Sequence, residues 1–315
     1  MEISESRDVA EVPSMQAPRV TVIIPVYNDL ARLRTCLDLL ATQTYPRELL
    51  DVIVADNASS IDLSSALPPA DERFRMIQEA KRGSYAARNA ALGLASGDVV
   101  AFTDADCLPH LDWIEVAVAA LVAPDAPDAV GGAIRLVFRD GPDPVTGPEL
   151  YESVHGFDQR HFVEGLGFAA TANLVTRREM IELVGPFNAD LQSGGDDDWG
   201  HRLRDAGGRL EYLATAVVDH PSRPTWSDLT IKAIRIADGM AALSREQSFG
   251  ADLAELAREL RSGLGSWLTI WGKDWPTTPG AKARYVAALS WVAVLRLVVR
   301  IRYRIRERLH RKSSG

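Results

Sequence analysis

Two hydrophobic patterns take turns along residues 20–122, namely short continuous apolar runs and apolar residues at helical spacing. Short apolar runs rich in β-branched residues are typical of strands buried on both faces of a sheet. They predict strands over Val20–Val26, Asp51–Asp56, Phe74–Gln78 and Asp98–Thr103. Apolar residues at helical spacing, capped by Asn28 or Asp29, predict a helix that contains Leu30, Leu33, Leu37 and Leu40. Two more helices are expected over Tyr85–Ala95 and Trp113–Val122.

The pattern is less regular after residue 129. Further strands are expected over Ala129–Phe138, Phe168–Val175 and Leu210–Asp219. Further helices are expected over Arg177–Val184, Asp197–Ala206 and Trp226–Arg261. Asp140–Pro148 is rich in turn-forming residues, and Tyr151–Gly167 has no clear period. Strands that alternate with helices predict an α/β fold, in which helices flank a mostly parallel sheet and a helical C-terminal extension follows.

Length and composition are those of an ordinary globular protein. The 315 residues are enough for one large α/β domain with an appendage, or for two modest domains. The two cysteines, Cys36 and Cys107, lack metal-ligand spacing, so we expect no disulfide framework and a reducing compartment. Residues 1–18 contain acidic residues and no apolar run, so we expect a disordered lead-in rather than a signal peptide.

Charge is distributed unevenly. The formal net charge is −8, yet residues 282–315 contain ten Lys and Arg against one acid, which leaves −17 on the remainder. An acidic body repels the phosphates of nucleic acids. We therefore expect no nucleic-acid partner for the main domain.

The segment AFTDADCLP gives the most informative chemical signal. Asp104 and Asp106 follow directly after a predicted buried strand and are one residue apart. Two such carboxylates can share one hard cation, Mn²⁺ or Mg²⁺, and leave positions open for diphosphate oxygens. The alternative is that they cap the next turn or helix. Later in the chain, His220 closes a strand and is a candidate further metal ligand, although a lone histidine is more often structural.

Two other segments suit nucleotide binding at the carboxyl ends of strands. In VIVADNAS, Asp56 can accept a hydrogen bond from a base, or it can cap a turn. In KRGSYAARN, Gly83 permits close backbone approach, and Arg82 and Arg88 can pair with phosphate or with acids of the surface. No Gly-x-Gly-x-x-Gly follows a strand, which argues against a dehydrogenase.

Three adjacent acids begin a late helix in QSGGDDDWGHRLR. Asp196, Asp197 and Asp198 repel one another, and the helix N-terminus offsets part of that cost. They are either acids placed to suit the helix dipole, or they include a general base. Helical geometry points the three side chains in different directions, so only one can face a substrate.

These segments, in this order and at these separations, resemble the family 2 glycosyltransferases, which have the glycosyltransferase A fold. The resemblance covers about Val20 to His220 and rests on VTVIIPVYND, DVIVADNAS, a helix ending in ARN, TDAD, and GGDDDWGHRLRDAG. It implies that Pro25 and Tyr27 line a nucleotide pocket and that Asp56 contacts the base.

The resemblance also implies a mechanism. Asp104 and Asp106 would form the family's Asp-x-Asp metal motif, and the sugar would be transferred with inversion in one in-line displacement. Family members often carry Glu-Asp before the late helix, with the Asp as base, whereas this chain has Gly195 and Asp196 there. This departure leaves the base between Asp196 and Asp197, and we favour Asp196.

The C-terminal segment has a different character. Ala281–Val299 is apolar around most of a helix, but Arg284 and Arg296 interrupt a run that would need about 20 apolar residues to span a bilayer. With Trp291 and the following arginines, it predicts a helix lying on an anionic membrane surface. The alternative is a helix packed on the body or between subunits.

The sequence therefore predicts an inverting, metal-dependent hexosyltransferase that uses Mn²⁺ or Mg²⁺ and a nucleotide-diphosphate sugar, with UDP-sugars the family's usual donors. We expect a glycan or lipid-linked acceptor, and a cytoplasmic enzyme held peripherally at the inner face of the cell membrane. A nucleotidyltransferase and a non-enzymatic nucleotide-sugar binding protein are the alternatives. The expected organisation is a catalytic domain at 19–222, with a nucleotide-sugar half (19–107) and an acceptor half (108–222). A helical extension (223–280) and a basic amphipathic tail (281–315) follow it.

Overall fold

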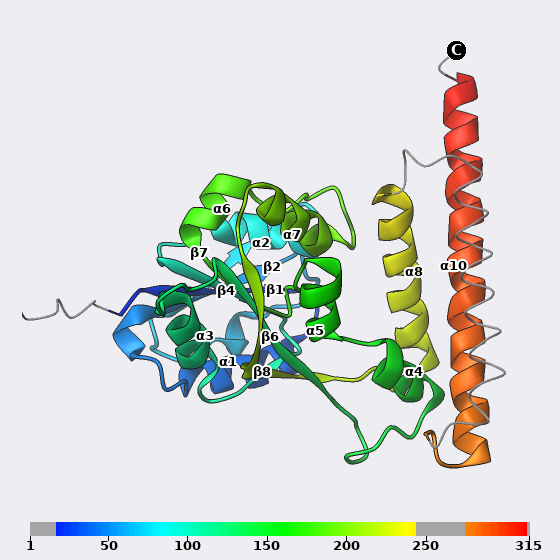
Figure 1. The fold of residues 1–315 in the computed structure, drawn as a ribbon, viewed down its shortest axis with the longest axis horizontal. Coiled ribbons are helices and arrows are strands. Elements are labelled where there is room, and N and C mark those ends of the chain that lie inside the picture. Colours follow the sequence, from blue (N-terminus) through cyan, green and yellow to red (C-terminus); the bar gives the residue numbers. More distant parts are fainter. Residues whose placement is uncertain (1–16, 244–274, 314–315) are drawn as a thin grey trace, which may run out of the picture.

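One mixed sheet forms the centre of the protein in a computed structural model, which describes residues 17–243 and 275–313 (Figure 1). Its strands are β1 (Val20–Val26), β2 (Leu50–Asp56), β3 (Phe74–Gln78), β4 (Val99–Thr103), β5 (Leu108–Pro109), β6 (Ala129–Val137), β7 (Asn173–Arg177) and β8 (Leu210–Pro221). Within the described residues they lie in the order β3-β2-β1-β4-β7-β6-β8-β5.

Strand direction brings the ends of distant strands to one edge. β3, β2, β1 and β4 are parallel neighbours. β7 is antiparallel to both β4 and β6, so β6 and its parallel neighbour β8 run in the same direction as β4. The carboxyl ends of β1, β2, β4 and β8 therefore meet at the same edge of the sheet, although up to two hundred residues separate them.

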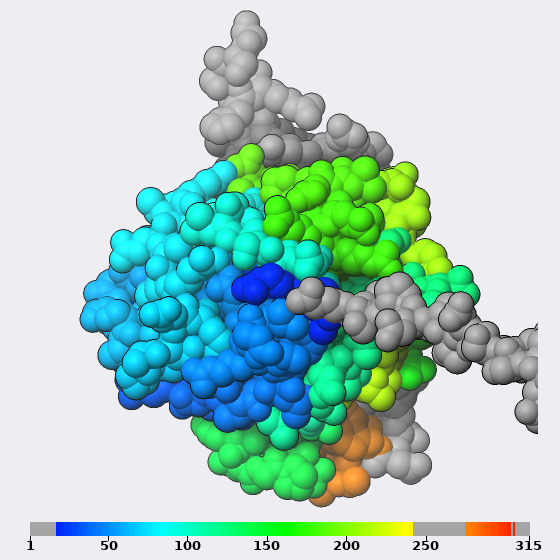
Figure 2. Space-filling model, turned by 90° about the vertical axis from the view of Figure 1, so that its left-hand side faces the viewer, coloured from blue at the N-terminus to red at the C-terminus, as the bar shows by residue number. Residues whose placement is uncertain are grey.

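Helices cover both faces of the sheet. They are α1 (Leu30–Ala41), α2 (Ser84–Leu92), α3 (Trp113–Val122), α4 (Gly147–His155), α5 (Gln159–His161), α6 (Arg178–Val184), α7 (Gly195–Asp205), α8 (Trp226–Leu243) and α10 (Pro279–Ser313). A π-helical turn, Phe162–Leu166, follows α5. Figure 2 shows the blue and cyan residues of the first half as one continuous surface, with the green residues beside it.

Alternation along the strands gives the sheet two cores. In β1, Val22 belongs to the core on the side of α1 and α3, whereas its neighbour Ile23 belongs to the core on the side of α2 and α7. The largest buried side chains of these cores include Trp113 of α3 and Trp199 of α7, which are at most 1% exposed. Full burial of a large apolar side chain contributes about 1.5–3 kcal/mol. Strands that are buried on both faces therefore consist of continuous apolar runs.

The C-terminal helices α8 and α10 lie side by side next to the sheet domain (Figure 1). Leu229 and Ala233 of α8 pack against Ala288 and Val292 of α10, and Tyr151 of α4 belongs to the same apolar cluster. Among the described residues, no helix combines the length and apolar character needed to cross a membrane.

The structure confirms the α/β fold with a mostly parallel, helix-flanked sheet and a helical C-terminal extension. The strand expected over Phe168–Val175 was placed wrongly, because β7 begins only at Asn173 and continues to Arg177. The helix expected over Tyr85–Ala95 ends at Leu92. The lead-in at residues 1–16 and the helical pattern over 244–261 lie outside the described residues.

Candidate active site

A cavity of about 520 Å³ opens at the carboxyl edge of the sheet. Its walls come from the ends of β1, β4 and β8, from the start of α2 and α7, and from α8. Most of the residues singled out from the sequence line it: Pro25, Tyr27, Arg82, Arg88, Asp104, Asp106, Asp196 and His220. Asp56 and Asp197 do not.

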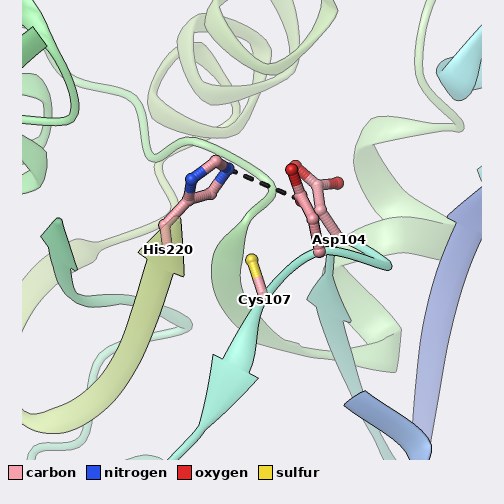
Figure 3. Close-up of side chains that lie close together, drawn as sticks. Asp104, Cys107 and His220 are labelled. Atoms are coloured by element: carbon pink, nitrogen blue, oxygen red, sulfur yellow. Dashed lines mark ion pairs between the residues drawn. The ribbon is translucent and has the colours of Figure 1, made fainter. Parts of the chain in front are cut away.

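A cluster of potential metal ligands lies on the cavity wall (Figure 3). One ligand atom each from Asp104, Asp106, Cys107 and His220 lies within 4.8 Å of all the others. The Nδ1–H of His220 donates to the carbonyl oxygen of Pro221 at 2.9 Å, because a carbonyl can only accept. The Nε2 lone pair is thereby left toward Asp106, whose Oδ1 is 3.6 Å away.

The chemistry of this donor set suits a hard divalent cation. Burial, followed by the charges of Asp104 and Asp106, raises the pKa of Cys107 well above its ordinary value, so it stays a thiol. Its Sγ donates to the carbonyl of Ala172 at 3.8 Å. The two carboxylates and the imidazole form a set of oxygen and nitrogen ligands that fits Mn²⁺ or Mg²⁺.

Arg88 holds one of these carboxylates from the side of α2. The Arg88 side chain is 3% exposed and forms an ion pair through Nη2 with Oδ1 of Asp104. Its guanidinium also lies 5.6 Å from the ring centre of Tyr85. The Nε–H of Arg88 is buried and has no hydrogen-bond partner among the described residues. Arg88 itself lines the cavity, so its positive charge lies beside the metal cluster.

Asp196 is held by a tyrosine from α2. The hydroxyl of Tyr85, which is 5% exposed, donates to Oδ1 of Asp196 at 2.9 Å. Burial and the charge of Asp196 raise the pKa of Tyr85 well above its ordinary value, so the phenol keeps its proton and donates. A Cβ on Gly195 would come within 2.8 Å of the Tyr85 ring, so the ring takes space that a Glu at this position would need.

The other two acids of the cluster have partners on their own helix. Oδ1 of Asp197 lies 3.8 Å from Nε2 of His201, and burial together with the neighbouring acids raises the pKa of Asp197 despite this histidine. Asp198 forms an ion pair with Arg202 at 3.0 Å. Of the three acids, Asp196 alone lines the cavity.

The opposite wall presents an exposed aromatic ring and a shaped loop. Tyr27 is 48% exposed, and the Arg82 guanidinium lies 4.1 Å over its ring. The side chain of Asn57 accepts from the N–H of Gly83 at 2.7 Å and so fixes the turn before α2, where Gly83 has φ +127°. Asp56 is 4% exposed behind this wall and accepts from the N–H of Ser59 at 3.0 Å.

Several residues of this site were missed from the sequence. Asn57 stands within a quoted motif, and its place directly after Asp56 was the available signal. Tyr85 also stands within a quoted motif but had no signal of its own, since its partner is 111 residues away. No sequence pattern indicated that basic residues after β8 and on α8 reach the cavity. These residues are Arg223, Lys232 and Arg235.

Comparison with known proteins places the chain in a family. The model of glycosyl transferase family 2 matches residues 21–184. Glycosyltransferase AglE from Haloferax volcanii is 35% identical over 226 residues, which are 70% of this chain and 73% of that protein. The pre-mycofactocin glycosyltransferase of Mycobacterium tuberculosis is 30% identical over 263 residues, 78% of this chain and 54% of that protein.

Two solved structures share the fold. The mannosyltransferase PcManGT from Pyrobaculum calidifontis, in complex with GDP-Man and Mn²⁺, superposes with a TM-score of 0.61 at 22% identity, covering 91% of this chain and 88% of that one. S. aureus TarS 1–349, in complex with UDP-GlcNAc, gives a TM-score of 0.51 at 14% identity, covering 93% of this chain and 92% of that one. The family match and the identity to AglE together show that this chain belongs to glycosyl transferase family 2.

Proposed function

We propose that the chain is an inverting glycosyltransferase in which Asp104, Asp106 and His220 hold Mn²⁺ or Mg²⁺ and Asp196 is the general base. Membership of the family makes the chain an enzyme that transfers a sugar from a nucleotide sugar. The observation that carries the finer proposal is that Asp104, Asp106 and His220 of the ligand cluster line the same cavity as Asp196.

The roles of the residues follow from their positions. The bound cation would neutralise charge on the departing diphosphate. Arg88 orients the Asp104 carboxylate, and its positive charge at the cavity wall would favour the same diphosphate. The exposed ring of Tyr27 offers a stacking face for the base, with Arg82 over it.

Asp196 supplies the proton acceptor. Its carboxylate takes the proton of the acceptor hydroxyl as the hydroxyl oxygen attacks the sugar, while the Tyr85 hydroxyl fixes its orientation. One in-line displacement inverts the anomeric configuration and needs no covalent intermediate. The alternatives of a nucleotidyltransferase and a binding protein are set aside, because the chain belongs to a glycosyltransferase family.

The donors bound by the two structural neighbours support a nucleoside-diphosphate sugar as substrate. PcManGT is in complex with GDP-Man and Mn²⁺, and TarS is in complex with UDP-GlcNAc. Because these donors carry different bases, both UDP- and GDP-sugars belong in the test.

We also propose that α10 contacts the surface of a membrane. Large apolar residues on this helix are 43–53% exposed at helical spacing, and they are Trp291, Val294, Val298, Ile301 and Ile305. Many basic residues follow on the same segment, which matches an anionic lipid surface in charge. Such a location would bring a lipid-linked or envelope glycan acceptor to the cavity.

Donor turnover tests the proposal. Purified full-length protein is incubated with Mn²⁺ and a panel of UDP- and GDP-sugars, and release of the nucleoside diphosphate is measured. Asp196→Asn should lower kcat by about 10²–10⁴-fold, the usual contribution of a general base. Asp197→Asn, the same change one residue later, should leave most of the activity. Equal losses in both variants would contradict the assignment of the base.

A further inference from the structure

Three basic side chains line the cavity beside the metal cluster. Arg223 follows β8, and Lys232 and Arg235 lie on α8. The same three side chains, together with Asp106 and Arg32, also line an adjoining cavity of about 200 Å³. They therefore lie between the two cavities, next to a proposed metal ligand.

This cationic group lies apart from the wall that carries the proposed nucleotide contacts. The adjoining cavity contains none of Tyr27, Arg82 or Arg88, although it shares Asp106 with the main cavity. The match to the family model ends at residue 184, so the three cations lie beyond the matched segment. The C-terminal part of this chain therefore contributes these three cations to the two cavities.

The group has more positive charge than its partners neutralise. The Glu152 side chain, 1% exposed, receives both Lys232, at 2.6 Å, and Arg223, whose Nη1 is 3.3 Å away. Arg235 is exposed and has no ion pair or hydrogen bond within the described part of the chain. The smaller cavity is also lined by the carboxylates Asp106 and Asp228, and by a fourth cation, Arg32. Its four cations therefore exceed its two carboxylates and Glu152 by one charge.

One face of α8 directs the cations into the cavity. Lys232 and Arg235 are three residues apart, and Ile236 one residue further also lines the cavity, so all three lie on one side of the helix. Leu229 and Ala233 of the same helix pack on α10 and hold the helix in place. The cations are thus presented by a packed helix rather than by a loose surface chain.

We propose that Arg223, Lys232 and Arg235 form a phosphate-binding site beside the metal cluster. Phosphate matches the excess positive charge, because its oxygens accept several charge-assisted hydrogen bonds from Arg and Lys at once. The inference rests on the proposed function and deepens it. Because the adjoining cavity contains none of the proposed nucleotide contacts, we assign the phosphate to the acceptor, which is then a phosphorylated molecule.

Arg235 is the residue to change, since it has no ion pair or hydrogen bond with any residue of 17–243 or 275–313 that the change would remove. Calorimetry on full-length protein measures two ligand pairs. The first is UDP and GDP with Mn²⁺, and the second is geranyl phosphate and uncharged geraniol in EDTA. Arg235→Gln should weaken binding of a phosphate ligand about tenfold, equivalent to about 1.4 kcal/mol. Arg235→Lys should keep part of that affinity.

Arg34→Gln is the matched control. Arg34 is an exposed arginine of α1 that lines neither cavity, and its replacement makes the same change in charge. It should bind all ligands as the wild type does. A loss confined to geranyl phosphate is the expected result. A loss confined to UDP and GDP would contradict the proposal, because the three cations would then hold the diphosphate of the donor.

The proposal is overturned if Arg235→Gln binds every phosphate ligand as tightly as the wild type. It is also overturned if geraniol loses as much affinity as geranyl phosphate, because the contact would then be with the hydrocarbon. Failure of the proposed function is seen separately. It would show as nucleotide binding that does not depend on Mn²⁺ or Asp104, whatever Arg235→Gln does.

Discussion

Removal of one hydroxyl tests how Asp196 is positioned. Tyr85→Phe deletes the donor to Oδ1 of Asp196 and leaves the ring in place. The ring's contact with Phe187, at 5.7 Å between ring centres, and its contact with Arg88 do not need the hydroxyl. The variant should therefore fold normally and bind donor nearly as well as the wild type.

The size of the effect follows from the bond that is lost. A hydrogen bond to a charged group contributes about 1.5–3 kcal/mol, and 1.4 kcal/mol corresponds to about a factor of ten. Asp196 keeps the N–H of Asp197 at 3.2 Å as a second donor, so some of its orientation survives. We expect kcat to fall about 10- to 100-fold, less than in Asp196→Asn.

The assay is steady-state transfer with saturating Mn²⁺, which separates kcat from the KM for the donor. Tyr45→Phe is the matched control, because Tyr45 is 6% exposed and its hydroxyl donates to the carbonyl of Pro18 at 2.5 Å, outside the cavity. It should lose similar stability and keep its kcat. A wild-type kcat in Tyr85→Phe, with an inactive Asp196→Asn, would refute the positioning role.

Three further outcomes are expected. Burial raises the pKa of Glu152, but the positive charges of Lys232 and Arg223 outweigh this effect, and the pKa is lowered overall. The stability from its charge is thus present above the unfolded-state value of 4.5 and lost as pH falls. Urea unfolding should show Glu152→Gln less stable at pH 7 by about 3–5 kcal/mol and less sensitive to acid than the wild type. Gly132→Ala would place its Cβ 2.4 Å from the carbonyl oxygen of Ala216, and a thermal melt should show a loss of about 1–3 kcal/mol or more. Ile301→Glu, on the exposed side of α10, should release the protein from anionic vesicles in co-sedimentation, and binding equal to that of the wild type would contradict membrane contact.

The strands were predictable where burial on both faces gives a continuous apolar run. Val20–Val26, which is buried throughout, was placed with the bounds that the structure has. The edge strand Phe74–Gln78 was also placed with its bounds, although only Phe74 is buried in it. β7 was misplaced because the side chain of Gln159 hydrogen bonds to the backbone of Ala170, at 3.0 Å to its N–H. The hydrogen bond that a strand partner would make to the backbone of this apolar segment is thus made by a side chain. No local pattern reports such a distant partner.

The helix α4 was missed although its sequence contains a start signal. Thr146 and Glu149 form a capping box, and Pro148 stands in the first turn, where proline is favoured. The surrounding glycines and prolines made the segment read as a loop. Its buried acids, Glu149 and Glu152, would have been hard to foresee, because their partners come from other elements.

Some residues of the candidate site were predictable from a local motif, and others were not. Asp104 and Asp106 were identified because both stand in one short motif after a strand, and strand direction brings His220 to them. Tyr85 and the cations of α8 depend on contacts between segments far apart in the chain. Their place in the cavity is decided by tertiary packing, which no motif encodes.

Manganese binding tests the central claim most directly. Electron paramagnetic resonance counts free Mn²⁺ as the protein is titrated in the presence of UDP or GDP. The account predicts one tightly bound ion whose affinity rises with nucleotide, and a loss of about tenfold or more in Asp106→Asn and in His220→Gln, as expected for removal of a ligand. Nucleotide-dependent binding of Mn²⁺ that is unchanged in both variants would contradict it.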